Sequence, residues 1–319
     1  MSQHRDGRRD LHTDWVAVNT PATSANLGPG FDSFGLALTL CDELRLQAVP
    51  DQPDLLDVVV RGEGADCVPT DESHLVVRSI RSTWSAMGVE QPGLRLHCDN
   101  RIPHARGLGS SAAAIVGGIV AARAVVADLD PAWDDEWALQ LATATEGHPD
   151  NVAACLYGGM TVAWTPPGGA RAVRLDPSRA IRPHVFIPDL QLSTDAVRGL
   201  LPDTVPHGDA ARTAGRAGLL VAAIQTGRSD VLLDATEDWL HQPYRRNAMP
   251  GSWQLVESLR STGTAAVISG AGPTVLALTS ADGPRQELSG PPGWRTPPVA
   301  VRSEGATASR SLRSQRIPG

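Results

Sequence analysis

The sequence contains no lysine, so all 28 residues counted as lysine plus arginine are arginines. This absence excludes a Walker A phosphate loop, which requires a Gly-Lys-Ser/Thr run. Any phosphate chemistry in this chain must therefore use arginine, backbone N–H groups, hydroxyls and a metal ion.

Cysteine is scarce, and long apolar runs are missing. The four cysteines form no CxxC or CxxH pair, which argues against zinc and fits reduced thiols (Cys41, Cys67, Cys98 and Cys155). Every apolar run is interrupted well short of a membrane span, and residues 1–14 lack the apolar segment of a signal peptide. We therefore expect a cytoplasmic protein with no membrane partner.

Charge and length narrow the class further. The net charge of −7 argues against a general nucleic-acid partner. A chain of 319 residues exceeds what one compact core usually holds, which predicts two domains. A Pro/Gly-rich break at 166–169 places the boundary, giving domains at 15–167 and 168–303 with flexible tails at 1–14 and 304–319.

The hydrophobic pattern mixes strands and helices along the whole chain. Pro21 is expected to end the first strand, and residues 71–73 are expected to cap a helix. The predicted strands are 16–18, 35–46, 55–60, 94–99, 158–164, 185–187, 265–269, 274–279 and 299–302, and further helices are predicted at 110–127, 134–145, 213–226 and 230–239.

A glycine-rich run at 102–114 follows the predicted strand at 94–99 and opens the Ala-rich helix at 110–127. Its glycines let the backbone approach a ligand, and the freed N–H groups of the helix start attract a phosphate. Two more segments, 26–32 and 269–274, couple glycines to hydroxyl or carboxylate side chains at strand ends. Each segment alone fits a tight turn, but the three together favour a phosphate-binding site.

These three segments resemble the signature motifs of the GHMP small-molecule kinases, and the match is closest to the homoserine kinase family. The resemblance spans residues 15–302 and is carried by PATSANLGPGFD at 21–32, EGHPDNV at 146–152, Leu192-Ser193-Thr194 with Arg198, and Gln242-Pro243-Tyr244-Arg245. It implies an α+β, two-domain GHMP kinase fold. The N-terminal domain would resemble domain 2 of ribosomal protein S5, with a left-handed βαβ crossover, and the C-terminal domain would be ferredoxin-like.

The resemblance also implies an activity. ATP would phosphorylate the hydroxyl of L-homoserine with Mg²⁺ as cofactor, a step toward threonine, in a chain that can form a homodimer. Two alternatives remain open: a GHMP kinase for another small amino alcohol or hydroxy metabolite, and a nucleotide-binding regulator without catalysis.

The resemblance assigns the nucleotide and metal ligands. Glu146 would hold the metal together with a loop serine, Ser111 being favoured over Ser110, although Glu146 could instead cap a helix end. His74 stands where relatives often have Asn, and it either contacts the base or caps a helix. The implied ATP-binding residues are Pro103, Arg106, Gly107, Leu108, Gly109, Ser110, Ser111, Ala112 and His74.

Homoserine is a zwitterion with a terminal hydroxyl, so its site needs a carboxylate, a guanidinium and a polar orienting group. Asp32 fits the ammonium, whereas Arg198 and Arg245 fit the carboxylate. Asn26 and Asn151 fit the hydroxyl, and with Arg245 they form the implied catalytic set. His148, Asp150 and Thr194 would line the same pocket.

The missing lysine also bears on the mechanism, because mevalonate-type relatives use a lysine–aspartate pair near the nucleophile. The resemblance implies instead that Asn26 orients the hydroxyl, whose proton leaves to the γ-phosphate or to solvent. Thr213 departs from the pattern, since homoserine kinases usually have Asn there.

Overall fold

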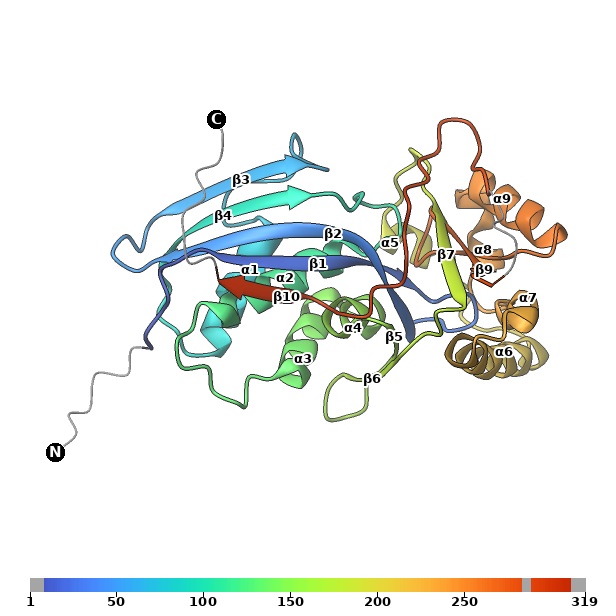
Figure 1. The fold of residues 1–319 in the computed structure, drawn as a ribbon, viewed down its shortest axis with the longest axis horizontal. Helices are drawn as coiled ribbons and strands as arrows, with labels where there is room; N and C mark the ends of the chain where they lie inside the picture. The colour runs from blue at the N-terminus through green and yellow to red at the C-terminus, as the bar shows by residue number, and fades with distance from the viewer. Residues whose placement is uncertain (1–8, 283–287, 311–319) are drawn as a thin grey trace.

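The structure is a computed structural model that describes residues 9–282 and 288–310. Parts of the expected tails, 1–8 and 311–319, lie outside the described residues. Two β-sheets lie side by side, and helices pack against each of them (Figure 1). No helix among the described residues is both long enough and apolar enough to cross a membrane.

The larger sheet has the strand order β10-β1-β2-β4-β3, and β5 joins β2 to β6. Most neighbours are antiparallel, but β3 and β4 are parallel and are joined through α1, which makes them the βαβ unit to which the expected crossover applies. The strands are β1 (Val16–Ala25), β2 (Phe34–Val49), β3 (Leu56–Gly62), β4 (Gly93–Asn100), β5 (Met160–Trp164), β6 (Arg171–Leu175) and β10 (Thr307–Arg310).

Four helices cover one face of this sheet: α1 (Leu75–Ala86), α2 (Ser110–Ala124), α3 (Asp135–Glu146) and α4 (Pro149–Tyr157) (Figure 1). Helix α2 is central and mostly buried, so its small residues set the packing distance. A Cβ on Gly117 would lie 2.5 Å from Leu44 Cδ2, and one on Gly118 would lie 2.7 Å from Ser79 Cβ. The Ala/Gly composition of α2 therefore allows the close approach that anchors its N-terminus.

The smaller sheet has the order β7-β9-β8, with an isolated bridge between Ile187 and Arg295 beyond β7. This is the order of a ferredoxin-like sheet whose fourth strand is reduced to one bridge. Its elements are β7 (Ile181–Phe186), α5 (Thr194–Arg198), α6 (His207–Thr226), η1 (Ser229–Val231), α7 (Leu232–Ala235), α8 (Gln242–Arg245), η2 (Arg246–Ala248), α9 (Pro250–Ser261), β8 (Ala265–Ile268) and β9 (Val275–Ser280).

One of the three buried apolar clusters of the described residues spans both halves of the protein. A single buried cluster includes Leu36 and Ile115 from the larger sheet and α2, together with Val185 and Leu276 from the smaller sheet. Apolar contacts therefore cross between the sheets beneath the crevice that separates the two halves.

Long-range pairing changes the expected domain limits. Strand β6 follows Pro167 but pairs with β5, so residues 171–175 belong to the larger sheet. Strand β10 pairs with β1 and lies inside the segment 304–319 that was expected to be a flexible tail. At the N-terminal side, Ala127 N donates to Asp10 O, so residues 9–14 are not wholly a free tail either.

Several local predictions also differ from the structure. Strand β1 continues past Pro21 because a register shift between Pro21 and Ala22 accommodates the missing N–H. The helix predicted at 230–239 ends at Ala235, and the strand predicted at 299–302 is reduced to a bridge between Leu38 and Val301.

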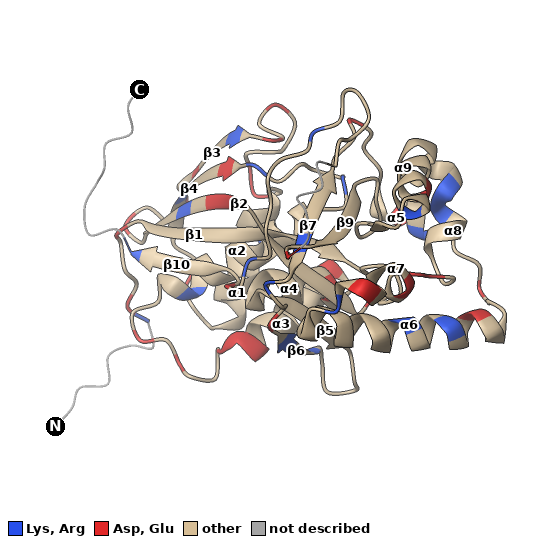
Figure 2. Ribbon diagram, turned by 45° about the vertical axis from the view of Figure 1, so that its right-hand side comes forward, with Lys and Arg blue, Asp and Glu red and all other residues tan. Residues whose placement is uncertain are grey.

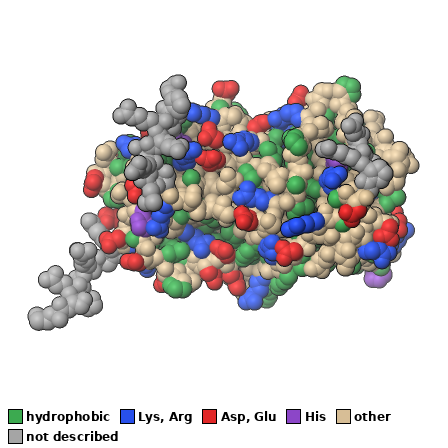
Figure 3. All heavy atoms as spheres, in the orientation of Figure 1, with side chains coloured by type: hydrophobic (Ala, Val, Ile, Leu, Met, Phe, Trp, Pro, Cys, Tyr) green, Lys and Arg blue, Asp and Glu red, His purple; other side chains and the backbone are tan. Residues whose placement is uncertain are grey.

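Acidic and basic residues are interspersed along the ribbon in both halves of the protein (Figure 2). On the face drawn in Figure 3, arginines and carboxylates alternate among apolar and neutral residues, so no continuous basic surface is visible there.

Candidate active site

The loop before α2 has the conformation that a phosphate cradle needs. Gly107 and Gly109 adopt φ values of +75° and +68°, in the left-handed region that favours glycine. A Cβ on Gly109 would lie 2.0 Å from Thr23 Oγ1, and one on Gly107 would lie 2.3 Å from Ser269 O. The loop is therefore clamped between β1 and the turn after β8, and the free N–H groups of α2 face the crevice.

The third glycine-rich segment connects the other two. It forms the turn between β8 and β9, where Ser269 Oγ lies 2.6 Å from Gly107 O and 2.8 Å from Ser24 Oγ. Gly270 N donates to Ala25 O at 3.0 Å, and Asn26 Nδ2 donates to Gly270 O at 2.9 Å. Three segments far apart in the chain thus form one continuous floor.

Two cavities meet at Ser110 and Ser111, the first residues of α2. The first cavity, of about 260 Å³, is lined mostly by polar and charged side chains, which come from both halves of the protein. The second, of about 320 Å³, lies within the larger domain and has apolar walls that include Leu44, Leu75 and Val76. A polar compartment and an apolar compartment joined at a helix N-terminus suit a charged small substrate and a nucleobase with phosphates between them.

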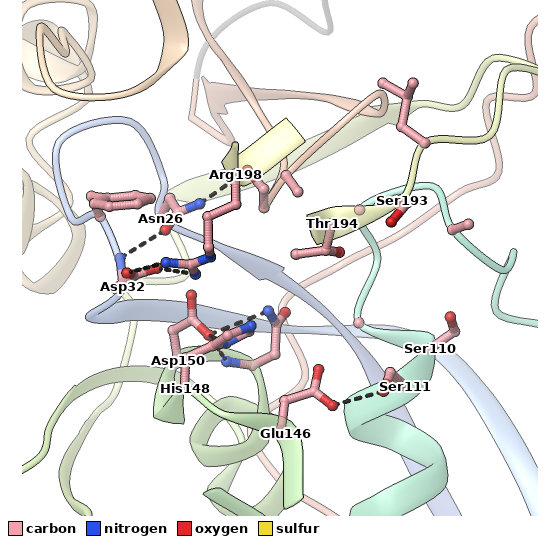
Figure 4. Close-up of a pocket in the computed structure, with 18 of the residues that line it drawn as sticks. Asn26, Asp32, Ser110, Ser111, Glu146, His148, Asp150, Ser193, Thr194 and Arg198 are labelled. Atoms are coloured by element: carbon pink, nitrogen blue, oxygen red, sulfur yellow. Dashed lines mark hydrogen bonds and ion pairs between the residues drawn. The ribbon is translucent and has the colours of Figure 1, made fainter. Parts of the chain in front are cut away.

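At the phosphate end of the first cavity, Ser111 Oγ donates to Glu146 Oε2 at 2.7 Å (Figure 4). Burial raises the pKa of Glu146, while the hydrogen bond from Ser111 opposes that shift. The Glu146 carboxylate thus faces a hydroxyl, and the helix end is closed by Gly147, whose N–H donates to Thr143 O.

The pair fits a Mg²⁺ site of the usual kinase kind. Mg²⁺ takes one or two protein oxygens and obtains its other ligands from phosphates and water. Within the described part of the chain, no group of three or more His, Cys, Asp or Glu side chains could hold a metal alone. A magnesium ion held by Ser111 and Glu146 would therefore depend on the bound phosphates.

At the opposite end, Arg198 of α5 forms two parallel hydrogen bonds of 2.8 Å each to the Asp32 carboxylate (Figure 4). Both side chains are partly exposed to the cavity, and the hydrogen bonds to Asp32 raise the pKa of Arg198. A zwitterion could place its ammonium against Asp32 and its carboxylate against Arg198 without adding net charge.

Arg245 is the deepest cation in the cavity. Its side chain is only 2% exposed, and its guanidinium lies 5.2 Å from the centroid of the Phe31 ring. Burial lowers the pKa of Arg245 to about 10, and the charge of Arg198 adds to that effect. No carboxylate in the described residues is within ion-pair distance of Arg245, and its Nε has no partner. A buried, unpaired guanidinium favours an anionic ligand group.

Asn26 and Asn151 line the first cavity, and each is also hydrogen-bonded to other residues of the protein. Asn26 Oδ1 accepts from Asp32 N at 2.9 Å, so with one Nδ2 hydrogen on Gly270 O a single amide hydrogen remains. Asn151 Oδ1 accepts from Thr23 Oγ1 at 2.7 Å. Asn26 therefore shapes the floor in addition to any role toward a substrate.

His148 and Asp150 form a second polar pair at the start of α4. His148 Nδ1 lies 2.6 Å from Asp150 Oδ1, and this contact raises the pKa of His148. Both residues line the first cavity, as does Thr194 at the start of α5. All the predicted substrate-binding residues therefore line the first cavity.

The predicted ATP-binding residues divide into two groups. Gly107, Gly109, Ser110 and Ser111 line the first cavity, and His74 lines the second. The other four, Pro103, Arg106, Leu108 and Ala112, do not line either cavity. Pro103, Leu108 and Ala112 are buried, and the Arg106 guanidinium donates to the carbonyls of Pro188 and Asp189. Arg106 stabilises the loop, because its guanidinium is already hydrogen-bonded to backbone carbonyls.

His74 precedes α1 but makes no side-chain cap bond to it, so the capping alternative is not observed. Residues 71–73 do not cap α1 either, since Asp71 Oδ1 accepts from Ser73 N within a turn. His74 is 5% exposed, burial lowers its pKa, and its Nδ1 has no partner. An unpaired ring nitrogen in an apolar cavity favours contact with a nucleobase.

Among the lining residues that sequence reasoning left without a role, two have notable contacts. Phe31 lies beside both arginines of the first cavity, with Arg198 5.6 Å and Arg245 5.2 Å from its ring centroid. Asp42 lines the second cavity and accepts from the N–H groups of Arg101 and Ile102. Phe31 could have been proposed from the sequence, because it precedes Asp32 in the motif at 21–32. No motif in the sequence indicates that Asp42 lines a cavity.

A phosphate loop at the start of a buried helix, beside a polar crevice between two sheets, defines the class of small-molecule kinases. Residues 74–159 match the family described as "GHMP kinases N terminal domain", and residues 220–289 match "GHMP kinases C terminal".

Similar proteins identify a family within this class of kinases. The chain is 53% identical to the homoserine kinase of Streptomyces coelicolor over 293 residues, covering 92% of this chain and 94% of that protein. It is 52% identical to the homoserine kinase of Streptomyces avermitilis over 295 residues, covering 92% and 95%. The crystal structure of homoserine kinase from Cytophaga hutchinsonii superposes with a TM-score of 0.79 at 23% identity, covering 97% and 100%, which shows the fold.

The chain therefore belongs to the homoserine kinase family of the GHMP kinases. The family resemblance and the expected two-domain α+β fold are both confirmed.

Proposed function

We propose that this chain transfers the γ-phosphoryl group of ATP to the hydroxyl of L-homoserine, forming O-phospho-L-homoserine and ADP. The observation that carries this proposal is the junction of the polar and apolar cavities at Ser110 and Ser111. The polar cavity offers a carboxylate and two guanidiniums to a zwitterion, and the relatives at about half identity are homoserine kinases.

In this proposal the amino acid lies across the Asp32–Arg198 pair. Its ammonium replaces one Arg198 contact on Asp32, and its carboxylate lies between Arg198 and Arg245. This arrangement supplies the anion that buried Arg245 lacks. The side chain of the substrate then extends toward Asn26 and the start of α2.

The nucleotide lies across the junction, with its base among the apolar residues near His74 and its phosphates at the N-terminus of α2. Mg²⁺ held by Ser111 and Glu146 would supply charge neutralisation on the phosphates.

Positioning and electrostatics carry the phosphoryl transfer. The remaining amide hydrogen of Asn26 orients the hydroxyl, whose proton leaves to the γ-phosphate or to solvent. The contact with Asp150 raises the pKa of His148, which favours the protonated ring and so a contact with an anionic group of a ligand.

A coupled ADP-release assay with L-homoserine, L-threonine, L-serine and mevalonate tests the proposal. We expect turnover with L-homoserine well above the other three. Turnover on a different alcohol would identify another GHMP kinase, and tight ATP binding without any turnover would identify a regulator. Either result would refute the proposed function.

Three further expectations from the sequence stay predictions: the homodimer, the cytoplasmic location and the lack of a nucleic-acid partner.

A further inference from the structure

The orientation of Arg245 depends on His241, a fully buried histidine one helical turn before it. His241 Nε2 lies 2.7 Å from the carbonyl oxygen of Gly28, and Arg245 Nη1 lies 3.2 Å from His241 Nδ1. Because a carbonyl only accepts, Nε2 must carry the hydrogen, which leaves Nδ1 as the acceptor for the arginine.

The electrostatics favour this neutral tautomer. Burial lowers the pKa of His241, and the nearby charge of Arg245 lowers it further against the opposing effect of Asp238. The Asp238 side chain is fully buried, and its Oδ2 lies 3.4 Å from His241 Nε2, the nitrogen that carries the hydrogen. Asp238 also accepts from the backbone N–H groups of Leu240, His241 and Gln242, which fixes the start of α8. A neutral His241 can therefore accept from Arg245 without repelling it.

His241 also links Arg245 to the first glycine-rich segment. Its ring stacks on Phe31 with centroids 4.9 Å apart and planes tilted by 22°. On the same segment, Gly28 approaches the chain before α8 so closely that a Cβ there would lie 2.6 Å from Thr236 O. One imidazole thus touches the backbone of the segment, its aromatic side chain and the buried guanidinium.

We propose that His241 is a positioning residue that aims Arg245 at the carboxylate of the amino-acid substrate through its Nδ1 lone pair. The identity of that amino acid rests on the proposed function. The hydrogen bond from Arg245 to Nδ1 fixes the guanidinium, whose Nε has no other partner, at the wall of the first cavity.

Three substitutions separate this role from simple packing. In His241→Asn the amide oxygen can occupy the place of Nδ1 and accept from Arg245, whereas in His241→Gln the amide reaches the place of Nε2 and Gly28. His241→Ala removes both contacts. His184→Ala is the control, since His184 bonds Thr279 across β7 and β9, outside both cavities.

The readouts are KM for L-homoserine, KM for ATP, kcat and thermal stability. A hydrogen bond to a charged group predicts a rise of about 10- to 100-fold in the homoserine KM for His241→Ala and His241→Gln. We expect His241→Asn to remain within about threefold of the unmodified protein, and kcat and the ATP KM to change little.

3-Amino-1-propanol supplies a second readout, because it keeps the ammonium and hydroxyl but has no carboxylate. Its kcat/KM should be the same in all variants, since Arg245 has nothing to bind. Equal losses in His241→Asn and His241→Ala, or a parallel loss with the aminoalcohol, would mean that His241 acts only in packing and would overturn the proposal.

Calorimetric measurement of L-homoserine binding distinguishes a failure of the His241 proposal from a failure of the proposed function. If L-homoserine binds but is not phosphorylated, the proposed function fails and the variants are ranked by Kd, with the same order expected. If the unmodified protein does not bind L-homoserine, both proposals fail.

Discussion

Replacing Gly109 by alanine should destabilise the protein and weaken ATP binding together. Gly109 immediately precedes α2 and has a φ of +68°. A Cβ added to Gly109 would lie 2.0 Å from Thr23 Oγ1. Thr23 is fully buried and donates to Asn151 Oδ1 at 2.7 Å, so it cannot move without breaking that bond.

The magnitude follows from two costs. A left-handed conformation costs an alanine about 1–2 kcal/mol. Displacing Thr23 breaks its bond to Asn151 and leaves the buried Thr23 hydroxyl without an acceptor, which costs about 1–3 kcal/mol. The sum is a loss of about 2–5 kcal/mol in the free energy of unfolding.

Urea unfolding followed by tryptophan fluorescence gives the stability, and steady-state kinetics gives the ATP KM. Gly215→Ala is the matched control, because Gly215 lies in the interior of α6 with nothing within 4 Å of its Cβ position. Alanine is favoured there by about 1 kcal/mol, so the two glycine substitutions should shift stability in opposite directions.

A double variant sharpens the test. In Gly109→Ala with Thr23→Ala the blocking hydroxyl is absent, so the combined loss should be smaller than the sum of the single losses. Unchanged stability and unchanged ATP KM in Gly109→Ala would refute the clamped-loop geometry.

Three other substitutions test separate parts of the site. Glu146→Gln should lower kcat by at least about tenfold and raise the Mg²⁺ concentration needed for half-maximal rate, because metal charge stabilisation is worth several kcal/mol; an unchanged Mg²⁺ titration would remove Glu146 from the metal site. Arg245→Met should raise the homoserine KM by about 10- to 100-fold, whereas Arg246→Met, at the exposed neighbour, should not; equal effects would contradict the assignment. Burial raises the pKa of Asp42 from 3.8 to about 6, so the folded state holds a proton that the unfolded state has lost, and stability from this group falls as pH rises through that range. Asp42→Asn should therefore have a higher Tm than the unmodified protein at pH 8 and lose that advantage below about pH 4; a constant difference across pH would refute the shift.

The sequence by itself determined the parts of the site that are local. A glycine-rich turn followed by a helix start needs contiguous residues, so the run at 102–114 could be recognised without a fold. The absence of lysine likewise excluded a Walker loop at once. The motifs at 21–32 and 146–152 then pointed to the family that the relatives confirm.

Only the tertiary structure decided which distant groups meet. Asp32 and Arg198 pair across 166 positions, and His241 reaches Gly28 across 213 positions, contacts that no local pattern encodes. Strand β10 was expected to be a tail because its sequence is polar, but pairing with β1 gives it strand structure. The family motifs assigned Asp32, Arg198 and Arg245 to one pocket, but the direct Asp32–Arg198 pair and the contacts of His241 with Phe31 and Arg245 were set by the tertiary structure. Propensity acts over a few residues, whereas pairing and burial depend on the whole fold.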